Sequence, residues 1–437
     1  MSILLNERAP WQPNSTEGWS LVQLKRPFAI ELGKMLRPEP LGADDIEVPY
    51  LKSQHVQWEG VRLEDLPTMW ASPNEVDALR LDIGDLLVCE GGDVGRAALI
   101  DVSPPENCII QNALHRVRGR GKASVAFLRY LLIHATNQEW FDVLCNRSTI
   151  AHFTVEKFGE MWAWLPPLLQ QQQLAALLDR ETSRLDALMA AKQEQLELIA
   201  EKRRALITRA VTQGLNADAP RRATGLPWLG EVPAHWEVVR LKYLAQGPLD
   251  YGANEAADED NPDFPRFIRI TDIDEDGNLR SDTFASLAPE LAEPYLLSDG
   301  DILLARSGAT VGKTFIYRAS MGPACFAGYL IRMHPQLRKV LADFIYNFSL
   351  TDSYWGQIRE SAIQSTIQNF SAEKYGDMVL PLPDLHEQML ITAYIEAETK
   401  KLDTLRETTE ISLGLIHEQR AALIAAAVTG KLDLINS

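Results

Sequence analysis

The feature that most constrains the fold is an internal repeat that covers nearly the whole chain. Three separate blocks keep an offset of 217 residues to within one residue: residues 19–25 match 236–242, residues 81–87 match 297–303, and residues 148–150 match 365–367. Chance does not hold one offset across several separate blocks. The sequence therefore predicts a tandem duplication, in which two similar units together account for the architecture.

Each copy of the repeat ends in a long segment with helical periodicity. The first runs over about residues 170–212 and the second over about residues 386–429, with Gly214 and Gly430 as expected stops. Apolar residues spaced three and four apart fall at matching positions in both segments, which predicts two antiparallel coiled-coil helices, each ~60 Å long. The predicted seam consists of Leu178, Leu185, Met189, Leu196, Ile199 and Leu206, and of Ile395, Leu402, Leu413, Ile416 and Leu423.

The rest of each copy predicts a globular domain of mixed α/β class. Short apolar runs at residues 86–88, 97–100 and 302–305, joined by glycine-rich turns, favour strands, and residues 127–135 and 340–350 favour helices. We therefore expect two tandem-repeat α/β domains separated by the two helices. The predicted order is a globular domain over 1–165, a helix over 166–214, a linker over 215–231, a second globular domain over 232–382 and a helix over 383–437.

Composition indicates a cytoplasmic protein. The four cysteines form no Cys-x-x-Cys pair, which argues against a disulfide framework or a zinc site. The first ten residues lack the charged and apolar regions of a secretory signal. No run approaches the apolar length that is needed to cross a bilayer.

The charge distribution singles out two basic stretches within an acidic chain. The formal net charge is −17, yet residues 107–138 and 302–342 contain Arg and Lys and neither Asp nor Glu, whereas residues 250–301 hold fifteen Asp and Glu against three Arg. Charges are screened beyond about 8 Å at physiological salt, so a distant acidic lobe does not stop a local basic surface from binding a polyanion. Two basic stretches at matching places in the repeat favour nucleic acid as the ligand. The alternative is that each is a solvated face.

Motifs that suggest catalysis depart from the patterns that the chemistry needs. Residues 308–314 (Gly-Ala-Thr-Val-Gly-Lys-Thr) are one residue short of a phosphate-binding loop, and a hairpin turn is the better interpretation. Residues 261–264 (Asn-Pro-Asp-Phe) resemble an adenine methyltransferase loop, but Asp263 replaces the second proline and no glycine-rich site for S-adenosylmethionine accompanies it. The eight histidines show no metal-binding spacing, and a Gly-x-Ser-x-Gly motif is absent. We predict no catalytic residue and no metal site.

Several blocks of the chain share one further pattern: the Leu-Pro segments at 165–167 and 380–383, the helix ends at 202–212 and 420–430, and the entry to the second domain at 227–236. Together these blocks resemble the specificity subunit of type I restriction–modification systems, and the likeness spans nearly the whole chain. One departure is the glutamine run at residues 170–173, where the family usually has Glu-Gln.

The resemblance implies a mechanism without chemistry in this chain. Each globular domain would recognise one half of a bipartite target in double-stranded DNA, and the helices would set the spacing and dock two adenine methyltransferase subunits. A motor–nuclease subunit would add ATP-driven cleavage. S-adenosylmethionine, ATP and magnesium would be bound by the partner subunits, and no cofactor is expected here.

Candidate DNA contacts combine basic side chains with polar ones that are able to reach base edges. In the first domain they are Tyr50, Lys52, His115, Arg116, Arg118, Arg120, Lys122, Asn146, Arg147, Ser148 and Thr149. In the second they are Arg266, Arg269, Arg306, Lys313, Arg332, Gln364, Ser365, Thr366, Gln368 and Asn369.

Two other functions are compatible with parts of this pattern. A protein-interaction scaffold, with two adaptor domains on a coiled coil, would have negligible affinity for duplex DNA at low salt. The recognition part of an enzyme that cuts beside its site would need a fused nuclease or methyltransferase domain, for which 437 residues leave no room.

Overall fold

The chain forms two compact units. The computed structural model describes residues 9–12, 17–121, 123–145, 152–256, 260–274, 277–363 and 369–432. The first unit contains Met1–Gln193 and Ile411–Ser437, and the second contains Glu194–Glu410. Each unit therefore combines one globular copy of the repeat with parts of both long helices.

A four-stranded antiparallel sheet of order β2-β10-β7-β8 forms the centre of the first unit. Strand β7 is apolar and buried at all four positions, as expected for a strand covered on both faces. A second sheet of order β6-β3-β9 pairs β3 with β9 in parallel. The strands are β1 (Ser20–Gln23), β2 (Phe28–Leu32), β3 (Ile46–Leu51), β4 (Val56–Gln57), β5 (Gly60–Val61), β6 (Thr68–Ala71), β7 (Leu86–Cys89), β8 (Ala97–Leu99), β9 (Ile109–Ile110), β10 (Leu114–Gly119) and β11 (Trp162–Leu165).

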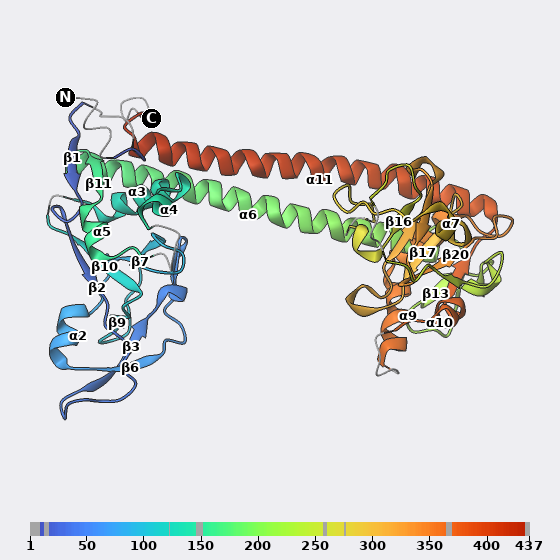
Figure 1. Ribbon diagram of the computed structural model, residues 1–437, viewed down its shortest axis with the longest axis horizontal. Helices are drawn as coiled ribbons and strands as arrows, with labels where there is room; N and C mark the ends of the chain where they lie inside the picture. Colours follow the sequence, from blue (N-terminus) through green and yellow to red (C-terminus); the bar gives the residue numbers. More distant parts are fainter. Residues whose placement is uncertain are drawn as a thin grey trace. The chain divides into compact units, whose positions relative to one another are not determined.

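Helix α3 (Val125–Asn137) packs on this sheet (Figure 1). It begins after Ser124, whose side chain accepts a hydrogen bond from the backbone N–H of Phe127. Phe127 shares a core with Leu86 and Val88 of β7. The other helical elements that the structure describes in this unit are α2 (Pro73–Leu79), α4 (Trp140–Leu144), α5 (Val155–Glu160) and the 3₁₀ turn η1 (Ser53–His55).

The second unit repeats this topology. Its four-stranded sheet has the order β15-β20-β17-β18, β16 pairs with β19 in parallel, and β14 pairs with β21 as β1 pairs with β11. The strands are β12 (Arg221–Ala223), β13 (Glu231–Pro233), β14 (Glu237–Arg240), β15 (Asp250–Tyr251), β16 (Arg266–Ile268), β17 (Ile302–Ala305), β18 (Thr314–Ile316), β19 (Ala324–Phe326), β20 (Leu330–Met333) and β21 (Val379–Leu382). Its shorter helices are α7 (Pro289–Ala292), α8 (Ala342–Ser349), α9 (Asp352–Ile363) and α10 (Ala372–Asp377), with 3₁₀ turns η2 (Leu241–Tyr243), η3 (Ile270–Asp272), η4 (Glu293–Tyr295), η5 (Gly308–Thr310) and η6 (Ala319–Met321). The predicted mixed α/β class and the duplication are confirmed.

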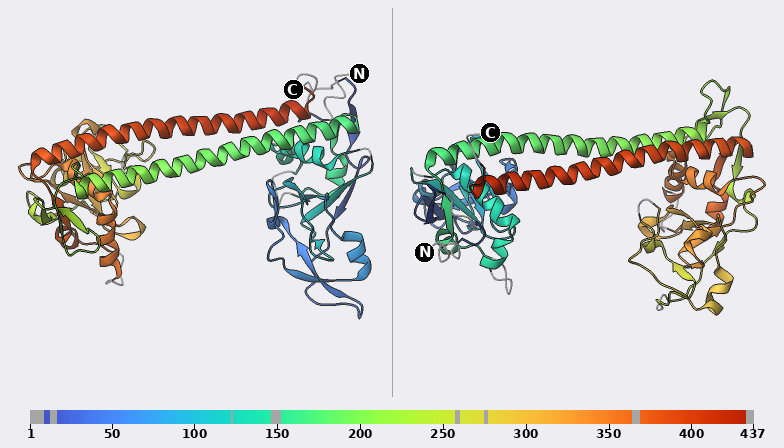
Figure 2. Two further views of the ribbon diagram at one scale, coloured as in Figure 1. Left: turned by 180° about the vertical axis from the view of Figure 1, so that it is seen from behind. Right: turned by 90° about the horizontal axis from the view of Figure 1, so that it is seen from above.

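The long helices α6 (Leu168–Gln213) and α11 (Leu385–Val428) lie side by side within each unit (Figures 1 and 2). In the first unit Leu178 shares a core with Ile424, and in the second Ile207 shares a core with Ile395. The predicted seam residues lie as follows: Leu178, Leu185, Ile199, Ile395, Leu402 and Ile416 are buried, and Met189, Leu196, Leu206, Leu413 and Leu423 are half-buried.

One ion pair between the helices occurs in both units at equivalent positions. In the first unit Arg420 Nε donates to Asp186 Oδ1 at 2.7 Å, and in the second Arg203 pairs with Asp403. The two arginines are 217 residues apart, and so are the two aspartates, which is the repeat offset. Within the first unit, Leu178 lies by Ile424 and Asp186 by Arg420, so the helices run antiparallel.

Helix α11 departs from one expectation of the sequence analysis. It contains an 18-residue stretch of mean hydropathy 1.2, so by length and composition alone it could cross a membrane. A single helix of this kind is weak evidence for a membrane protein. In both units α11 packs against α6, and its residues Ile395 and Ile424 lie in the domain cores, whereas Ile411 and Leu415 are exposed.

Candidate nucleic-acid interface

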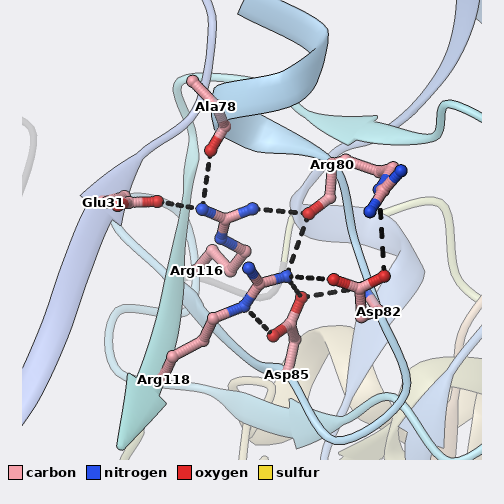
Figure 3. A network of polar contacts seen from close by, with 7 residues as sticks. All are labelled: Glu31, Ala78, Arg80, Asp82, Asp85, Arg116 and Arg118. Carbon is pink, nitrogen blue, oxygen red and sulfur yellow. Dashed lines mark hydrogen bonds and ion pairs between the residues drawn. The ribbon is translucent and has the colours of Figure 1, made fainter. Parts of the chain in front are cut away.

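Two arginines of β10 belong to a polar network that ties three segments of the first unit together (Figure 3). The Arg116 side chain is only 5% exposed, and it donates to the Glu31 carboxylate and to the backbone carbonyls of Ala78 and Arg80. These partners come from β2 and from the end of α2. Its donors are therefore used to fix the sheet to α2.

Arg118 is engaged by carboxylates in the same network (Figure 3). Its Nη2 donates to Asp82 at 2.8 Å and to Asp85 at 2.7 Å. The hydrogen bond that Arg118 donates to Asp85 raises the pKa of Arg118. Asp85 also accepts from the backbone N–H of Asp82, so the pair holds the turn before β7.

Three predicted DNA contacts of the first unit have their side chains inside the fold. Tyr50 is 6%, His115 is 0% and Arg116 is 4% exposed. His115 Nε2 lies 2.6 Å from the carbonyl oxygen of Phe153, and burial lowers the pKa of His115, which favours the neutral ring. Side chains buried in this way are not placed to reach a base edge.

The basic residues of the second unit are also largely engaged. Arg332 donates to both carboxylate oxygens of Asp250, at 3.1 and 2.6 Å. Arg269 likewise donates to both carboxylate oxygens of Asp272. Arg266 donates to the carbonyl of Arg280. These arginines stabilise loops and strand pairs, and a DNA contact would have to compete with carboxylates already in place.

The acidic stretch is therefore not distant from the basic one, as the sequence analysis assumed. Asp250 and Asp301 both lie in residues 250–301, and they pair with Arg332 and His334 of the basic stretch. Two acids of residues 250–301 thus have their partners in residues 302–342 within the fold.

Residues 308–314 form a turn between two antiparallel strands, as the hairpin interpretation predicts. Gly308–Thr310 is the 3₁₀ turn η5, and β17 pairs with β18 on either side of it. Lys313 Nζ donates to the carbonyl of Ile273 at 2.8 Å, and the Thr314 hydroxyl is bonded to the carbonyl of Gly312. The lysine and the hydroxyl that a phosphate-binding loop would present thus serve the fold. They line a cavity of about 840 Å³ between α6, α8 and α11.

Among the predicted contacts that the structure describes, Arg120 and Asn369 are exposed. Seven are half-buried: Lys52, Arg118, Arg266, Arg269, Arg306, Lys313 and Arg332. Nine others lie outside the described residues: Lys122, Asn146, Arg147, Ser148, Thr149, Gln364, Ser365, Thr366 and Gln368.

Arg306 is the centre of a polar and aromatic surface in the second unit. Its guanidinium lies 4.7 Å from the centre of the Tyr251 ring, and Nε donates weakly to Asn369 Oδ1 at 3.4 Å. The backbone carbonyl of Tyr329 accepts a hydrogen bond from the backbone N–H of Arg306, and Tyr329 is 67% exposed. We did not predict the two tyrosines from the sequence. The sequence feature that could have pointed to them is a neighbouring glycine, since Tyr251 precedes Gly252 and Tyr329 follows Gly328. At both glycines a Cβ atom would collide with neighbouring atoms.

Metal-binding and thiol chemistry find no support in the part of the chain that the structure describes. There, His, Cys, Asp and Glu form no cluster that could hold a metal ion. Burial raises the pKa of Cys108 and of Cys325 to about 12, so these thiols stay protonated.

Comparison with known proteins gives one consistent family. Residues 17–198 match the family model of the type I restriction modification DNA specificity domain. The specificity subunit of type I restriction enzyme MjaVIII from Methanocaldococcus jannaschii is 22% identical over 96% of this chain and 94% of its own length. The specificity subunit of type I restriction enzyme EcoBI from Escherichia coli is 22% identical over 65% of this chain and 61% of its own length, so this match spans less than two thirds of that relative.

Solved structures share the fold. A chain from a structural study of complex assembly and conformational transition in the type I R-M system has a TM-score of 0.72 and 16% identity, and the match covers 96% of this chain and 100% of that one. The HsdS subunit from Thermoanaerobacter tengcongensis has a TM-score of 0.54 and 17% identity, with 95% and 98% covered.

Proposed function

We propose that this chain is a specificity subunit of a type I restriction–modification system, in which each globular unit recognises one half of a bipartite DNA target. The observation that carries the proposal is the duplicated α/β unit with its shared antiparallel helices, the same fold as in the structures compared above. A duplicated unit offers two similar surfaces to two different DNA segments. Linking two modest binding sites in one chain raises the local concentration of the second once the first is bound.

The chemistry, in this proposal, lies in partner subunits. We infer that two adenine methyltransferase subunits dock on the helices and that a motor–nuclease subunit joins them. S-adenosylmethionine, ATP and magnesium would then act in the partners. The specificity subunit would supply positioning alone, within the cytoplasm.

The alternative of a scaffold that does not bind DNA has no observation in its favour. It and the proposal differ in one measurable property, which is affinity for duplex DNA when the partners are present. The family relation makes DNA the expected ligand.

Co-expression with the methyltransferase subunits of a type I system tests the proposal. The purified complex should bind random duplex DNA more weakly as salt is raised, and it should methylate adenine within one bipartite motif in a host that lacks adenine methylation. A complex that assembles but neither binds DNA at low salt nor methylates it would refute the proposal.

A further inference from the structure

Glu90 in the first unit and Arg306 in the second occupy the same place in the repeated fold. Each directly follows the central strand of its four-stranded sheet, β7 or β17. The backbone N–H of Glu90 donates to Ala113 at 2.9 Å, and that of Arg306 donates to Tyr329 at 3.1 Å. The carbonyl of Glu90 accepts from Phe153, as that of Arg306 accepts from Phe370. The two positions are therefore equivalent in hydrogen bonding as well as in sequence.

The side chains at this position have opposite hydrogen-bonding character. Glu90 carries only acceptors, and its Oε1 lies 4.0 Å from His152 Nδ1, beyond hydrogen-bond distance, whereas Arg306 carries only donors, and its Nε donates to Asn369 Oδ1 at 3.4 Å. His152 and Asn369 are themselves 217 residues apart. Both copies therefore place two polar side chains near each other at this position, but the acceptor Glu90 of the first unit is replaced by the donor Arg306 in the second.

The structural ion pairs of the repeat behave differently. The pair between Arg116 and Glu31 has its counterpart in Arg332 and Asp250, since each arginine lies opposite its acid in the same strand pairing. This pair keeps its polarity in both copies, as a pair that holds the sheet together would. The inversion at Glu90 and Arg306 is not required by the fold.

Arg306 is also held without being neutralised. In the part of the chain that the structure describes, no carboxylate lies within ion-pair distance of it, and its two hydrogen bonds, to Asn369 and to the carbonyl of Gly328, are long at 3.4 and 3.3 Å. The Tyr251 ring orients the guanidinium from one face. The planar guanidinium of Arg306 is oriented but only weakly hydrogen-bonded within the protein. It can therefore give up these hydrogen bonds and donate to a ligand instead.

We propose that this position reads a base in each half of the target, an inference that rests on the proposed function. Arg306 would donate to the O6 and N7 acceptors of a guanine in the half-target of the second unit. Glu90 would accept from the N4 amine of a cytosine in the half-target of the first unit. One scaffold position with inverted chemistry explains how two similar units recognise different sequences.

The test maps the methylated motif of the assembled complex for the wild type and for single variants. Arg306→Gln should relax one guanine position in the second half-target, with a loss of discrimination of roughly 10- to 100-fold, and leave the first half-target unchanged. Glu90→Gln should relax one cytosine position in the first half-target alone. Arg221→Gln, an exposed arginine of β12, removes the same charge and should change no base preference.

A second variant separates recognition from folding. Arg306→Lys keeps the positive charge but loses the planar fork, so it should lose the guanine preference while the complex binds non-specific DNA as the wild type does. If both Arg306 variants and Glu90→Gln methylate the wild-type motif with unchanged preference at every position, the inference is wrong and the proposed function stands. A wild-type complex without any bipartite motif would overturn the proposed function, and the inference with it.

Discussion

The Arg116 network leads to a prediction that separates stability from DNA binding. Arg116→Ala removes a side chain that is 5% exposed and leaves the Glu31 carboxylate and the Ala78 carbonyl without their donor, whereas the Arg80 carbonyl keeps its hydrogen bond from Arg118. Breaking a buried ion pair costs about 3–5 kcal/mol, and the 47% exposure of Glu31 lets water recover part of this. We expect the first unit to lose about 2–3 kcal/mol, which corresponds to a fall of about 5–10 °C in its melting temperature.

Arg120→Ala is the matched control, because Arg120 lies on the same strand end and is exposed. Its stability should stay within about 0.5 kcal/mol of the wild type. If Arg120 meets a phosphate, its loss lowers the slope of log affinity against log salt by about one.

Thermal unfolding by calorimetry and DNA binding at several salt concentrations measure both effects on the same proteins. Arg116→Ala should leave the salt slope unchanged in the fraction that remains folded. An Arg116→Ala protein as stable as the wild type, or one with a reduced salt slope at full stability, would refute this account of the network.

Three further predictions follow from the architecture. Exchanging residues 232–380 for a related domain should change one half-target and leave the other, as methylation mapping would reveal; a change in both would contradict modular recognition. Inserting one heptad into α6 and into α11 at matching depth lengthens each helix by ~10 Å, so DNA binding assays should find a preferred gap longer by about 3 base pairs or lost binding at the old gap. Because burial lowers the pKa of His115 and of His134 below the ordinary 6.5, the unfolded chain takes up more protons in acid. The melting temperature should therefore fall as the pH drops below about 6.5, and His115→Gln should reduce that dependence.

Features with a period or an offset could be predicted from the sequence. The repeat fixed the number of units, and the three-to-four spacing located α6 and α11 to within a few residues at each end. Both signals are carried by many residues at once. An error at any single position therefore leaves the prediction intact.

Whether an individual arginine is paired with a carboxylate could not be predicted in this way. Arg116 meets Glu31 across 85 residues of chain, and Arg332 meets Asp250 across 82. These partners are set by which strands lie side by side. A stretch without acids in the sequence consequently says little about whether its arginines are free, and the basic stretches overstated the accessible charge in both units.

A duplicated chain offers its own internal comparison for separating the two roles of a polar residue. Where both copies need the same pair to hold the same strands, the pair keeps its polarity, as Arg116 with Glu31 and Arg332 with Asp250 do. Where the fold accepts either an acid or a base, as at Glu90 and Arg306, packing does not determine the choice. The choice of side chain at such a position is then determined by what the unit contacts. Two units that contact different DNA sequences need different hydrogen-bonding groups there. Recognition is therefore best sought where the two copies share a backbone and differ in side-chain chemistry.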